Sequence, residues 1–126
     1  MAKVLYIDDN FDNRMLVMRV LMASDHAFEF VEADSAILGI QIASDDPPDI
    51  ILMDISMPDM DGLTATTKIR ELPALDHVPV IALTANAMEG DKERTLEAGC
   101  DGYIRKPVDI DKLPEQIMTY VGSRHS

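Results

Sequence analysis

The sequence is poor in cysteine, aromatic residues and positive charge. It contains one cysteine and no tryptophan in 126 residues, and aromatic residues make up 5% of the chain. A single cysteine cannot form an internal disulfide, which excludes a small disulfide-held secreted fold and favours a reducing, cytoplasmic location. No apolar run is long enough to span a bilayer, and the first residues lack the pattern of a signal peptide.

The shortage of positive charge narrows the range of partners. Lys and Arg together number 11 against 23 Asp and Glu, so the formal net charge is -12. A molecule with this charge is repelled by the phosphate backbone of nucleic acids and by anionic membrane surfaces. We therefore expect neither direct nucleic-acid binding nor membrane binding.

The chain does contain a regular alternation of short apolar runs and helical patterns. Its length and its hydrophobic content of 47% fit one globular domain, which we place at 1–122, followed by a frayed tail at 123–126. The predicted strands are 4–7, 28–31, 49–53, 78–83 and 102–104. The predicted helices are 12–23, with Asp12 as N-cap, and 33–44, 63–70, 86–98 and 111–121. Five strands alternating with five helices predict an α/β fold with a doubly wound parallel sheet.

The third predicted strand ends on a carboxylate. Its apolar run lies between Pro47-Pro48 and Met57-Pro58 and stops at Asp54. Such a run is typical of a strand covered on both faces by helices. Open parallel sheets bind their ligands beyond the carboxyl ends of the strands, so Asp54 is placed for chemistry rather than packing.

Other predicted strands also end at polar residues, which are Asp8 and Asp9, Thr84, and Lys106. If these residues converge with Asp54, three carboxylates lie together and need a compensating cation. Oxygen ligands favour Mg²⁺, and the absence of nearby His or Cys disfavours zinc. The lysine and the threonine hydroxyl would then complete a cradle for a phosphoryl group, with Asp54 as nucleophile. Taken singly, each residue is more often an acidic turn, a helix cap or a solvated charge; their joint occurrence favours a site.

Several longer segments carry a more specific pattern. They are Ile7-Asp8-Asp9-Asn10 with Asn13-Arg14, Pro48 through Asp54, Met57-Pro58 with Asp61-Gly62, Pro79 through Ala85, and Ala98-Gly99 through Lys106-Pro107. On these segments the chain resembles, over essentially its whole length, the receiver domain of two-component response regulators, of the stand-alone single-domain type. The resemblance implies a flavodoxin-like (βα)5 fold with strand order 2-1-3-4-5.

The same resemblance implies roles for individual residues. Asp54 would be the phosphoacceptor, and Mg²⁺ would be held by Asp8, Asp9, Asp54 and the backbone carbonyl of Ser56. Lys106 would contact the phosphoryl group, Thr84 and Tyr103 would form the switch, and the Lys106-Pro107 bond would be cis.

The resemblance also implies the partners and limits the catalysis. The phosphoryl donor would be a phosphohistidine of a sensor histidine kinase or of a histidine phosphotransfer protein. The domain would catalyse its own phosphotransfer and slow dephosphorylation, and so would not be an enzyme acting on other substrates. With no effector domain after the fifth helix, its output would be contact with a downstream protein target, unless the chain is an excised part of a longer protein.

The first predicted helix carries two apolar stripes. The stripe expected to cover the sheet consists of Leu16, Val17, Val20 and Leu21. A second stripe, on roughly the opposite face, consists of Met15, Met18 and Met22. Either the last helix packs on these methionines, which often fill gaps, or they are exposed and dock the helical bundle of the phosphoryl donor.

Of three alternative functions, the residues argue against the first two and leave the third open. A flavodoxin-like FMN carrier would need a phosphate-binding loop where this chain has two carboxylates. A small Mg²⁺-dependent phosphatase would need a positioned general acid or base, and none is evident. A receiver-like adaptor that works without phosphorylation would have the same fold.

Overall fold

A computed structural model describes residues 1–85 and 91–123 of the chain. Its strands are β1 (Ala2–Ile7), β2 (Phe28–Ala33), β3 (Ile50–Asp54), β4 (Val80–Thr84) and β5 (Gly102–Arg105). Its helices are α1 (Phe11–Met22), α2 (Ala36–Asp45), α3 (Gly62–Arg70), α4 (Asp91–Glu97) and α5 (Leu113–Tyr120), with a short 3₁₀ helix η1 (Pro73–Leu75). No helix in these residues is both long and apolar enough to cross a membrane.

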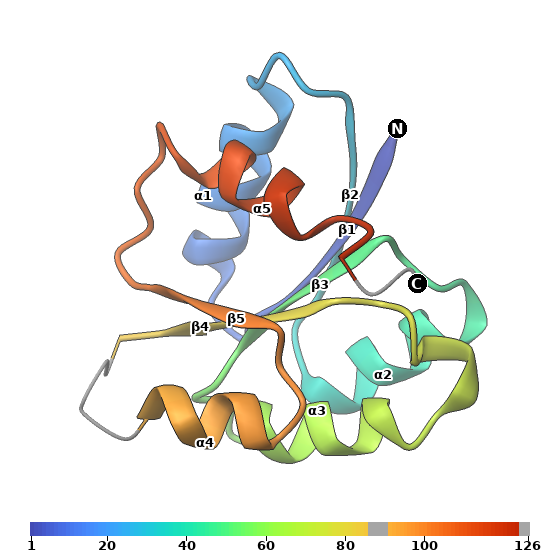
Figure 1. Ribbon diagram of the computed structural model, residues 1–126. Helices are drawn as coiled ribbons and strands as arrows, with labels where there is room; N and C mark the ends of the chain where they lie inside the picture. The colour runs from blue at the N-terminus through green and yellow to red at the C-terminus, as the bar shows by residue number, and fades with distance from the viewer. Residues whose placement is uncertain (86–90, 124–126) are drawn as a thin grey trace.

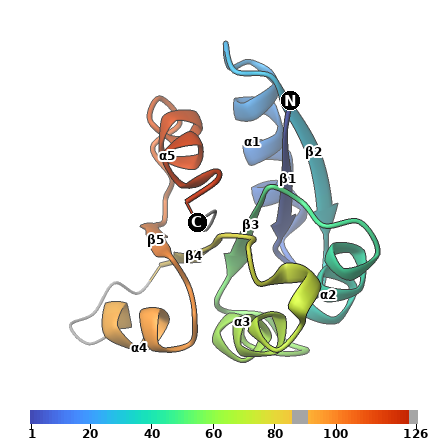
Figure 2. The same cartoon turned by 45° about the vertical axis from the view of Figure 1, so that its right-hand side comes forward.

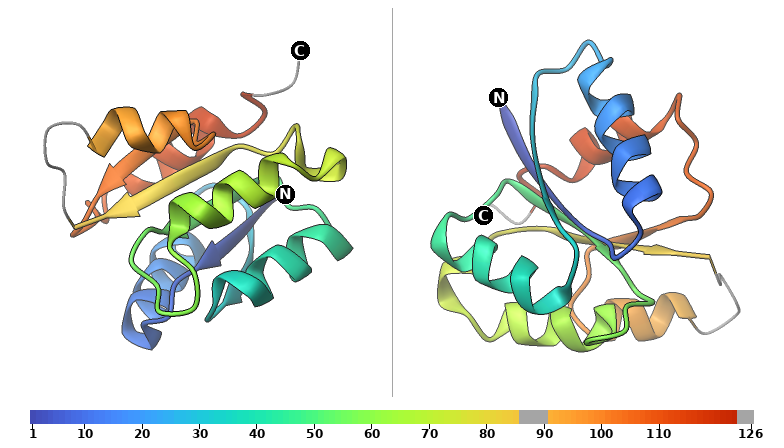
Figure 3. Two further views of the ribbon diagram at one scale, coloured as in Figure 1. Left: turned by 90° about the horizontal axis from the view of Figure 1, so that it is seen from below. Right: turned by 180° about the vertical axis from the view of Figure 1, so that it is seen from behind.

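The strands form one parallel sheet in the order β2-β1-β3-β4-β5, which confirms the predicted fold class and strand order. Helices α1 and α5 cover one face of the sheet, and α2, α3 and α4 cover the other (Figures 1 and 2). Seen from below, α2, α3 and α4 lie in a single layer (Figure 3). The sheet is therefore enclosed between two helical layers, and its strand ends are left at the rim.

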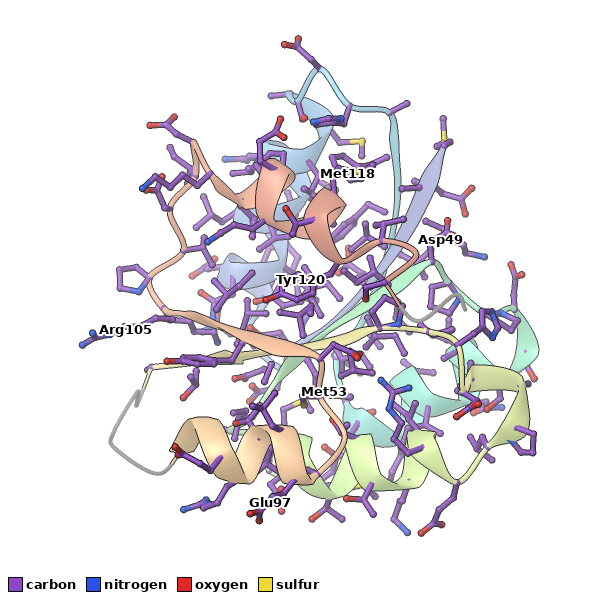
Figure 4. The ribbon with its side chains drawn as sticks, viewed as in Figure 1. Asp49, Met53, Glu97, Arg105, Met118 and Tyr120 are labelled. Atoms are coloured by element: carbon purple, nitrogen blue, oxygen red, sulfur yellow. The ribbon has the colours of Figure 1, made fainter. Side chains whose placement is uncertain are left out.

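Each face of the sheet has its own hydrophobic core, because alternate residues of a strand point to opposite faces. Val4 and Tyr6 of β1 belong to the core beneath α1 and α5, whereas Leu5 and Ile7 belong to the core beneath α2 and α3. Strands β3 and β4 are buried at every residue, as expected for strands covered on both faces. Arg105, in contrast, points away from the sheet at the end of β5 (Figure 4).

The first helix begins one residue earlier than predicted, and its cap is different. The N-cap is Asn10, whose side-chain oxygen accepts the backbone N–H of Asn13 at 2.9 Å. The prediction of Asp12 as N-cap was therefore wrong. Asp12 lies inside the first turn, where its negative charge still complements the positive end of the helix dipole.

The second strand and helix also meet at a different point. Pairing with β1 extends β2 to Ala33, so α2 starts at Ala36 rather than at 33. Ser35 caps α2 by accepting the backbone N–H of Leu38. Asp59, from the loop after β3, accepts two further N–H groups of the same first turn. The side-chain caps that decide this helix start come partly from a loop distant in sequence.

The remaining helices agree with the prediction in their position and differ at their ends. Residues 86–90, which include the predicted start of the fourth helix and Gly90, lie outside the described residues, and α4 is described from Asp91. The last helix starts at Leu113, with Pro114 in its first turn as predicted. Residues 124–126 of the expected tail are also outside the described residues.

The stripe of α1 that covers the sheet is narrower than predicted. Val17 and Leu21 are buried, and Val20 is half-buried. Leu16 is 44% exposed, so the expectation that it covers the sheet was wrong. Residues four positions apart lie above one another on a helix, so Val17 and Leu21 share the line of α1 that faces the sheet. Leu16 lies beside this line.

Candidate functional site

The carboxyl ends of four adjacent strands bring the predicted polar residues to one rim of the sheet. Asp8 directly follows β1, Thr84 is the last residue of β4, and Lys106 directly follows β5. Asp54 is the last residue of β3 and pairs with Leu83, so it belongs to the strand rather than to the loop beyond it. Since a parallel sheet aligns all its carboxyl ends, residues up to 98 positions apart in sequence become neighbours.

Three carboxylates form an acidic cluster at this rim. Asp8, Asp9 and Asp54 each offer a carboxylate oxygen, and the three oxygens lie within 4.8 Å of one another. Asp8 and Asp54 are buried, whereas Asp9 is exposed. The Lys106 ammonium lies 3.2 Å from Asp8 Oδ2 and 3.2 Å from Asp54 Oδ1. One ammonium between the two buried carboxylates leaves the cluster with excess negative charge, which suits a bound cation.

The pKa values of the two buried carboxylates, Asp8 and Asp54, are shifted in opposite directions. Burial, together with the negative charge of Asp8, raises the pKa of the Asp54 carboxyl above its ordinary value in spite of Lys106. Burial also acts to raise the pKa of Asp8, but hydrogen bonds from Tyr6 and Asn10 and the charge of Lys106 outweigh it and lower that pKa. Such a divergence is typical of carboxylates with different tasks in one site.

Asp8 is held by a network of donors. Its Oδ2 accepts hydrogen bonds from the Tyr6 hydroxyl at 2.6 Å, from Lys106 Nζ at 3.2 Å and from Asn13 Nδ2 at 3.3 Å. Its Oδ1 accepts the backbone N–H of Asn10 at 2.9 Å. Arg14 adds a bond from Nη1 to the Asp8 backbone carbonyl at 2.8 Å. These contacts fix both the carboxylate and the peptide that leads to Asp9.

From the sequence, Tyr6 is expected only as part of an apolar strand. The signal was present, since residues at i and i+2 of a strand point to the same face and Tyr6 stands two before Asp8. Asn13 and Arg14 were noted only as part of a matching segment. Their contacts with Asp8 follow from α1 starting directly after the acidic loop.

The other predicted site residues lie as follows. The Ser56 backbone N–H donates to Asp54 Oδ1 at 3.3 Å, and the residue is exposed. Thr84 is 8% exposed, and its backbone carbonyl accepts the N–H of Lys106 at 2.7 Å. Tyr103 is half-buried against the core beneath α2 and α3. The Lys106-Pro107 peptide bond is cis.

The methionines of α1 are neither fully buried nor uniformly exposed. Met15 and Met18 are half-buried, and Met22 is 52% exposed. Beside them, a cavity of about 330 Å³ extends from α1 to the segment after β5 and includes Leu16 and Lys106 in its lining. Among the described residues of α1, Leu16 thus lines the cavity beside Lys106, and the three methionines do not.

The fold and the rim together define a class, namely doubly wound α/β domains with clustered carboxylates and a lysine at the strand ends. The family model of the response regulator receiver domain matches residues 4–118. The chain belongs to the response regulator receiver domain family. It is thus a receiver of two-component signal transduction.

Individual relatives agree with this assignment. The polar-differentiation response regulator DivK of Brucella ovis is 38% identical over 119 residues, which cover 94% of this chain and 95% of DivK. The receiver domain of sensor histidine kinase PA1611 from Pseudomonas aeruginosa, solved with magnesium in its active-site cleft, is 32% identical with a TM-score of 0.86 over 96% of this chain and 98% of that one. The chemotaxis protein CheY4 of Vibrio cholerae is 26% identical with a TM-score of 0.87 over 94% and 98%.

Proposed function

We propose that Asp54 accepts a phosphoryl group from a phosphohistidine of a sensor histidine kinase or histidine phosphotransfer protein. The observation that carries the proposal is the position of Asp54. It is a buried carboxylate at the end of a central strand, 3.2 Å from the Lys106 ammonium and within the same cluster as Asp8 and Asp9. A carboxylate nucleophile in such a setting forms an acyl phosphate.

In the proposed step an Asp54 carboxylate oxygen attacks the phosphorus atom and the phosphorus–nitrogen bond of the phosphohistidine breaks. The electron pair of that bond returns to the imidazole, which leaves and takes up a proton from solvent. Lys106, whose ammonium already contacts Asp54 Oδ1, is placed to pair with the phosphoryl oxygens as charge accumulates on them. The Ser56 N–H donates to the same Asp54 oxygen at 3.3 Å.

We propose Mg²⁺ as the cofactor of this step, held by Asp8, Asp9, Asp54 and the backbone carbonyl of Ser56. The donor set fits, because it offers oxygen atoms alone and its buried members carry more negative charge than Lys106 compensates. When bound, Mg²⁺ supplies positive charge against the phosphoryl oxygens. The magnesium in the cleft of the PA1611 receiver domain supports this choice.

We propose that phosphorylation acts through Thr84 and Tyr103. Phosphate on Asp54 would draw the Thr84 hydroxyl towards it, and Tyr103 would turn inward into the space left. Thr84 ends the strand beside β3, and Tyr103 lies in the neighbouring strand β5, so the two are suited to relay the change. Identical Thr84 and Tyr103 rotamers in free and phosphate-mimic-bound structures would contradict this relay.

The proposed output is contact with a downstream protein target in the cytoplasm, with no catalysis on other substrates. The single cysteine is buried and free, which is compatible with a reducing compartment. The excess of acidic residues argues against nucleic acid and anionic membranes as targets.

The proposal is tested by intact-protein mass spectrometry after incubation with a small phosphodonor and Mg²⁺. The unmodified chain should gain the mass of one phosphoryl group, and Asp54→Asn should gain none, because the amide keeps the shape but removes the nucleophile. Asp25→Asn, in the exposed connection between α1 and β2, is the control and should be phosphorylated like the parent. A full adduct on Asp54→Asn would overturn the assignment.

The same incubation separates the alternatives. Rapid release of phosphate over many turnovers, with no adduct accumulating on the chain, would identify a phosphatase. Absence of any adduct on the unmodified chain, with Mg²⁺ and donor in excess, would identify an adaptor that works without phosphorylation.

A further inference from the structure

Tyr6 connects the hydrophobic core to the acidic cluster. It is one of the largest fully buried side chains of the described residues, and its ring belongs to the core beneath α1 and α5. Its hydroxyl donates to Asp8 Oδ2 at 2.6 Å, a shorter contact than those of Lys106 and Asn13 with the same oxygen. Because a strand repeats every two residues, Tyr6 and Asp8 point to the same face and this bond forms within β1 and its immediate continuation.

The packing of the ring fixes where the hydroxyl can be. The Tyr6 ring lies 6.5 Å from the ring of Phe30, tilted by 58°, and the side chain is 1% exposed. A phenol enclosed in this way cannot turn to a different acceptor without repacking the core. Asp8, itself 0% exposed, therefore meets a donor whose position is set by the interior rather than by solvent.

The other donors to Asp8 Oδ2 are less restricted. Lys106 is shared between Asp8 and Asp54, and in the proposed phosphotransfer its ammonium is needed by the phosphoryl oxygens. Asn13 reaches the same oxygen from α1 at 3.3 Å. If Lys106 turned towards a phosphoryl group, Tyr6 and Asn13 would remain as neutral donors to Oδ2, and the Tyr6 bond is the shorter of the two and the one anchored in the core.

We propose that Tyr6 is a positioning residue of the Mg²⁺ site: its buried hydroxyl fixes the Asp8 carboxylate in the orientation that the bound ion requires. The inference rests on the proposed function, since it assumes that the acidic cluster binds Mg²⁺. Hydrogen-bond partners behind a metal ligand commonly change metal affinity by 10- to 100-fold when they are removed. A rigid support of this kind is what holds a ligand within the narrow geometry that Mg²⁺ accepts.

The test is the affinity of Tyr6→Phe for Mg²⁺, measured by isothermal titration calorimetry in the absence of any phosphodonor. The substitution removes one oxygen atom and keeps the ring that packs on Phe30. We expect Mg²⁺ to bind about tenfold more weakly, because Asp8 regains rotational freedom that binding must then remove.

Tyr120→Phe is the matched control. Tyr120 extends from α5 towards the sheet and packs against the same core (Figure 4). Within residues 1–85 and 91–123, the Asp8 carboxylate accepts its tyrosine hydrogen bond from Tyr6 and not from Tyr120. Tyr120→Phe should bind Mg²⁺ like the parent. Equal affinities of Tyr6→Phe and the parent, or an equal loss in Tyr6→Phe and Tyr120→Phe, would overturn the inference while leaving the Mg²⁺ site itself intact. If the parent bound no Mg²⁺, the metal site and this inference would both be overturned.

A second measurement uses the unmodified chain and so does not depend on how a variant folds. The buried hydroxyl proton of Tyr6 should give a slowly exchanging, downfield proton resonance, and this resonance should shift as Mg²⁺ is added, because Asp8 is polarised by the ion. A Tyr6 hydroxyl resonance that stayed unchanged through saturation with Mg²⁺ would contradict the proposed role.

Discussion

At the scale of single residues, hydrogen-bond donors are distributed unevenly among the carboxylates of the rim. Asp8 accepts from Tyr6, Asn10, Asn13 and Lys106, whereas Asp54 accepts from Lys106 and the Ser56 N–H. Asp54 is thus the less satisfied of two buried carboxylates. It gains most from a cation or a phosphoryl group that shares its charge.

The raised pKa of Asp54 leads to a prediction about stability without metal. An acid whose pKa is higher in the folded than in the unfolded chain binds its proton more tightly when folded, so its ionisation costs stability as pH rises through that interval. Asp54→Asn should therefore be more stable than the parent at pH 7. The gain should shrink as pH falls through the raised pKa towards the ordinary value of 3.8.

Urea unfolding of metal-free protein across a pH series measures this effect. Asp25→Asn serves as the control, because it removes one carboxylate at an exposed position in the connection between α1 and β2, outside the acidic cluster. A metal-free Asp54→Asn that was less stable than the parent at pH 7 would show that the Lys106 contact outweighs burial.

Gly62 lies so close to the backbone of Asp54 and Ile55 that there is no room for a side chain at this position. A Cβ at this position would lie 2.5 Å from the Asp54 carbonyl oxygen and 2.8 Å from Ile55 Cα, which are backbone atoms that cannot turn aside. Gly62→Ala should therefore destabilise the fold by about 1–3 kcal/mol and displace the Asp54 peptide. Equilibrium unfolding in urea measures the loss.

Gly39→Ala is the comparison for this prediction. The added methyl group would clash with Cδ1 and Cγ1 of the buried Ile7 side chain, which would have to shift, whereas the obstacle at Gly62 is backbone. Ala also favours a helix interior by about 1 kcal/mol over Gly. Its net cost should be smaller than that of Gly62→Ala. A larger loss of stability in Gly39→Ala than in Gly62→Ala would show that the loop after β3 adjusts to an added methyl group more easily than the core does.

At the scale of elements, the alternation of apolar runs and helical patterns was enough to predict five strands and five helices. The resemblance supplied the strand order, and the sheet confirms it. The ends of elements were less predictable, because they depend on partners distant in sequence. The start of α2 is an example: β1 extends β2 to Ala33, and Asp59 from another loop bonds to the first turn of the helix.

In the site, too, one part was predictable from the sequence and another was not. Strand ends identified Asp8, Asp54, Thr84 and Lys106 as neighbours, since topology alone brings them to one rim. Which donor holds which carboxylate oxygen depends on side-chain packing that a linear pattern does not contain. The sequence pattern therefore predicts Tyr6 only as an apolar strand residue, whereas in the structure its hydroxyl lies 2.6 Å from Asp8 Oδ2.

The exposed face of α1 gives a prediction about partner recognition. Met18 lies half-buried on the helix that also contributes Leu16 to the cavity beside Lys106. If a phosphoryl donor docks there, Met18→Glu places a charge in an apolar contact and should slow transfer from the cognate protein donor by about tenfold. Transfer from a small phosphodonor should be unchanged, because that donor needs no docking surface.

Ile37→Glu is the control for Met18→Glu. Ile37 is 60% exposed on α2, which covers the other face of the sheet, so the same change of polarity should leave both transfers unaffected. Equal slowing of Met18→Glu with both donors would indicate damage to the fold and remove the case for docking on α1.

At the scale of the whole molecule, part of the excess negative charge lies at a place where a cation can bind. The chain carries a formal charge of -12, and three of its carboxylates meet at one rim. Repulsion among them opposes folding in the absence of metal, whereas a cation bound to the folded state alone stabilises it by about 2.7 kcal/mol at 100 times its dissociation constant. In the proposed Mg²⁺ site, stability without metal would thus be lower in exchange for affinity for the ion.

Asp9→Ala should raise the stability of the metal-free protein and, by the same substitution, weaken the stabilisation by Mg²⁺. Asp9 is the exposed member of the cluster, so its removal leaves no buried cavity and takes away one repelling charge. The metal-free variant should unfold at a higher urea concentration than the parent, yet gain far less from added Mg²⁺. Asp25→Ala makes the same change in net charge in the connection between α1 and β2, outside the acidic cluster, and should keep the full gain from Mg²⁺. If Asp9→Ala were stabilised by Mg²⁺ as strongly as Asp25→Ala, Asp9 would not be a ligand, and the ion would have to be held by Asp8, Asp54 and the backbone.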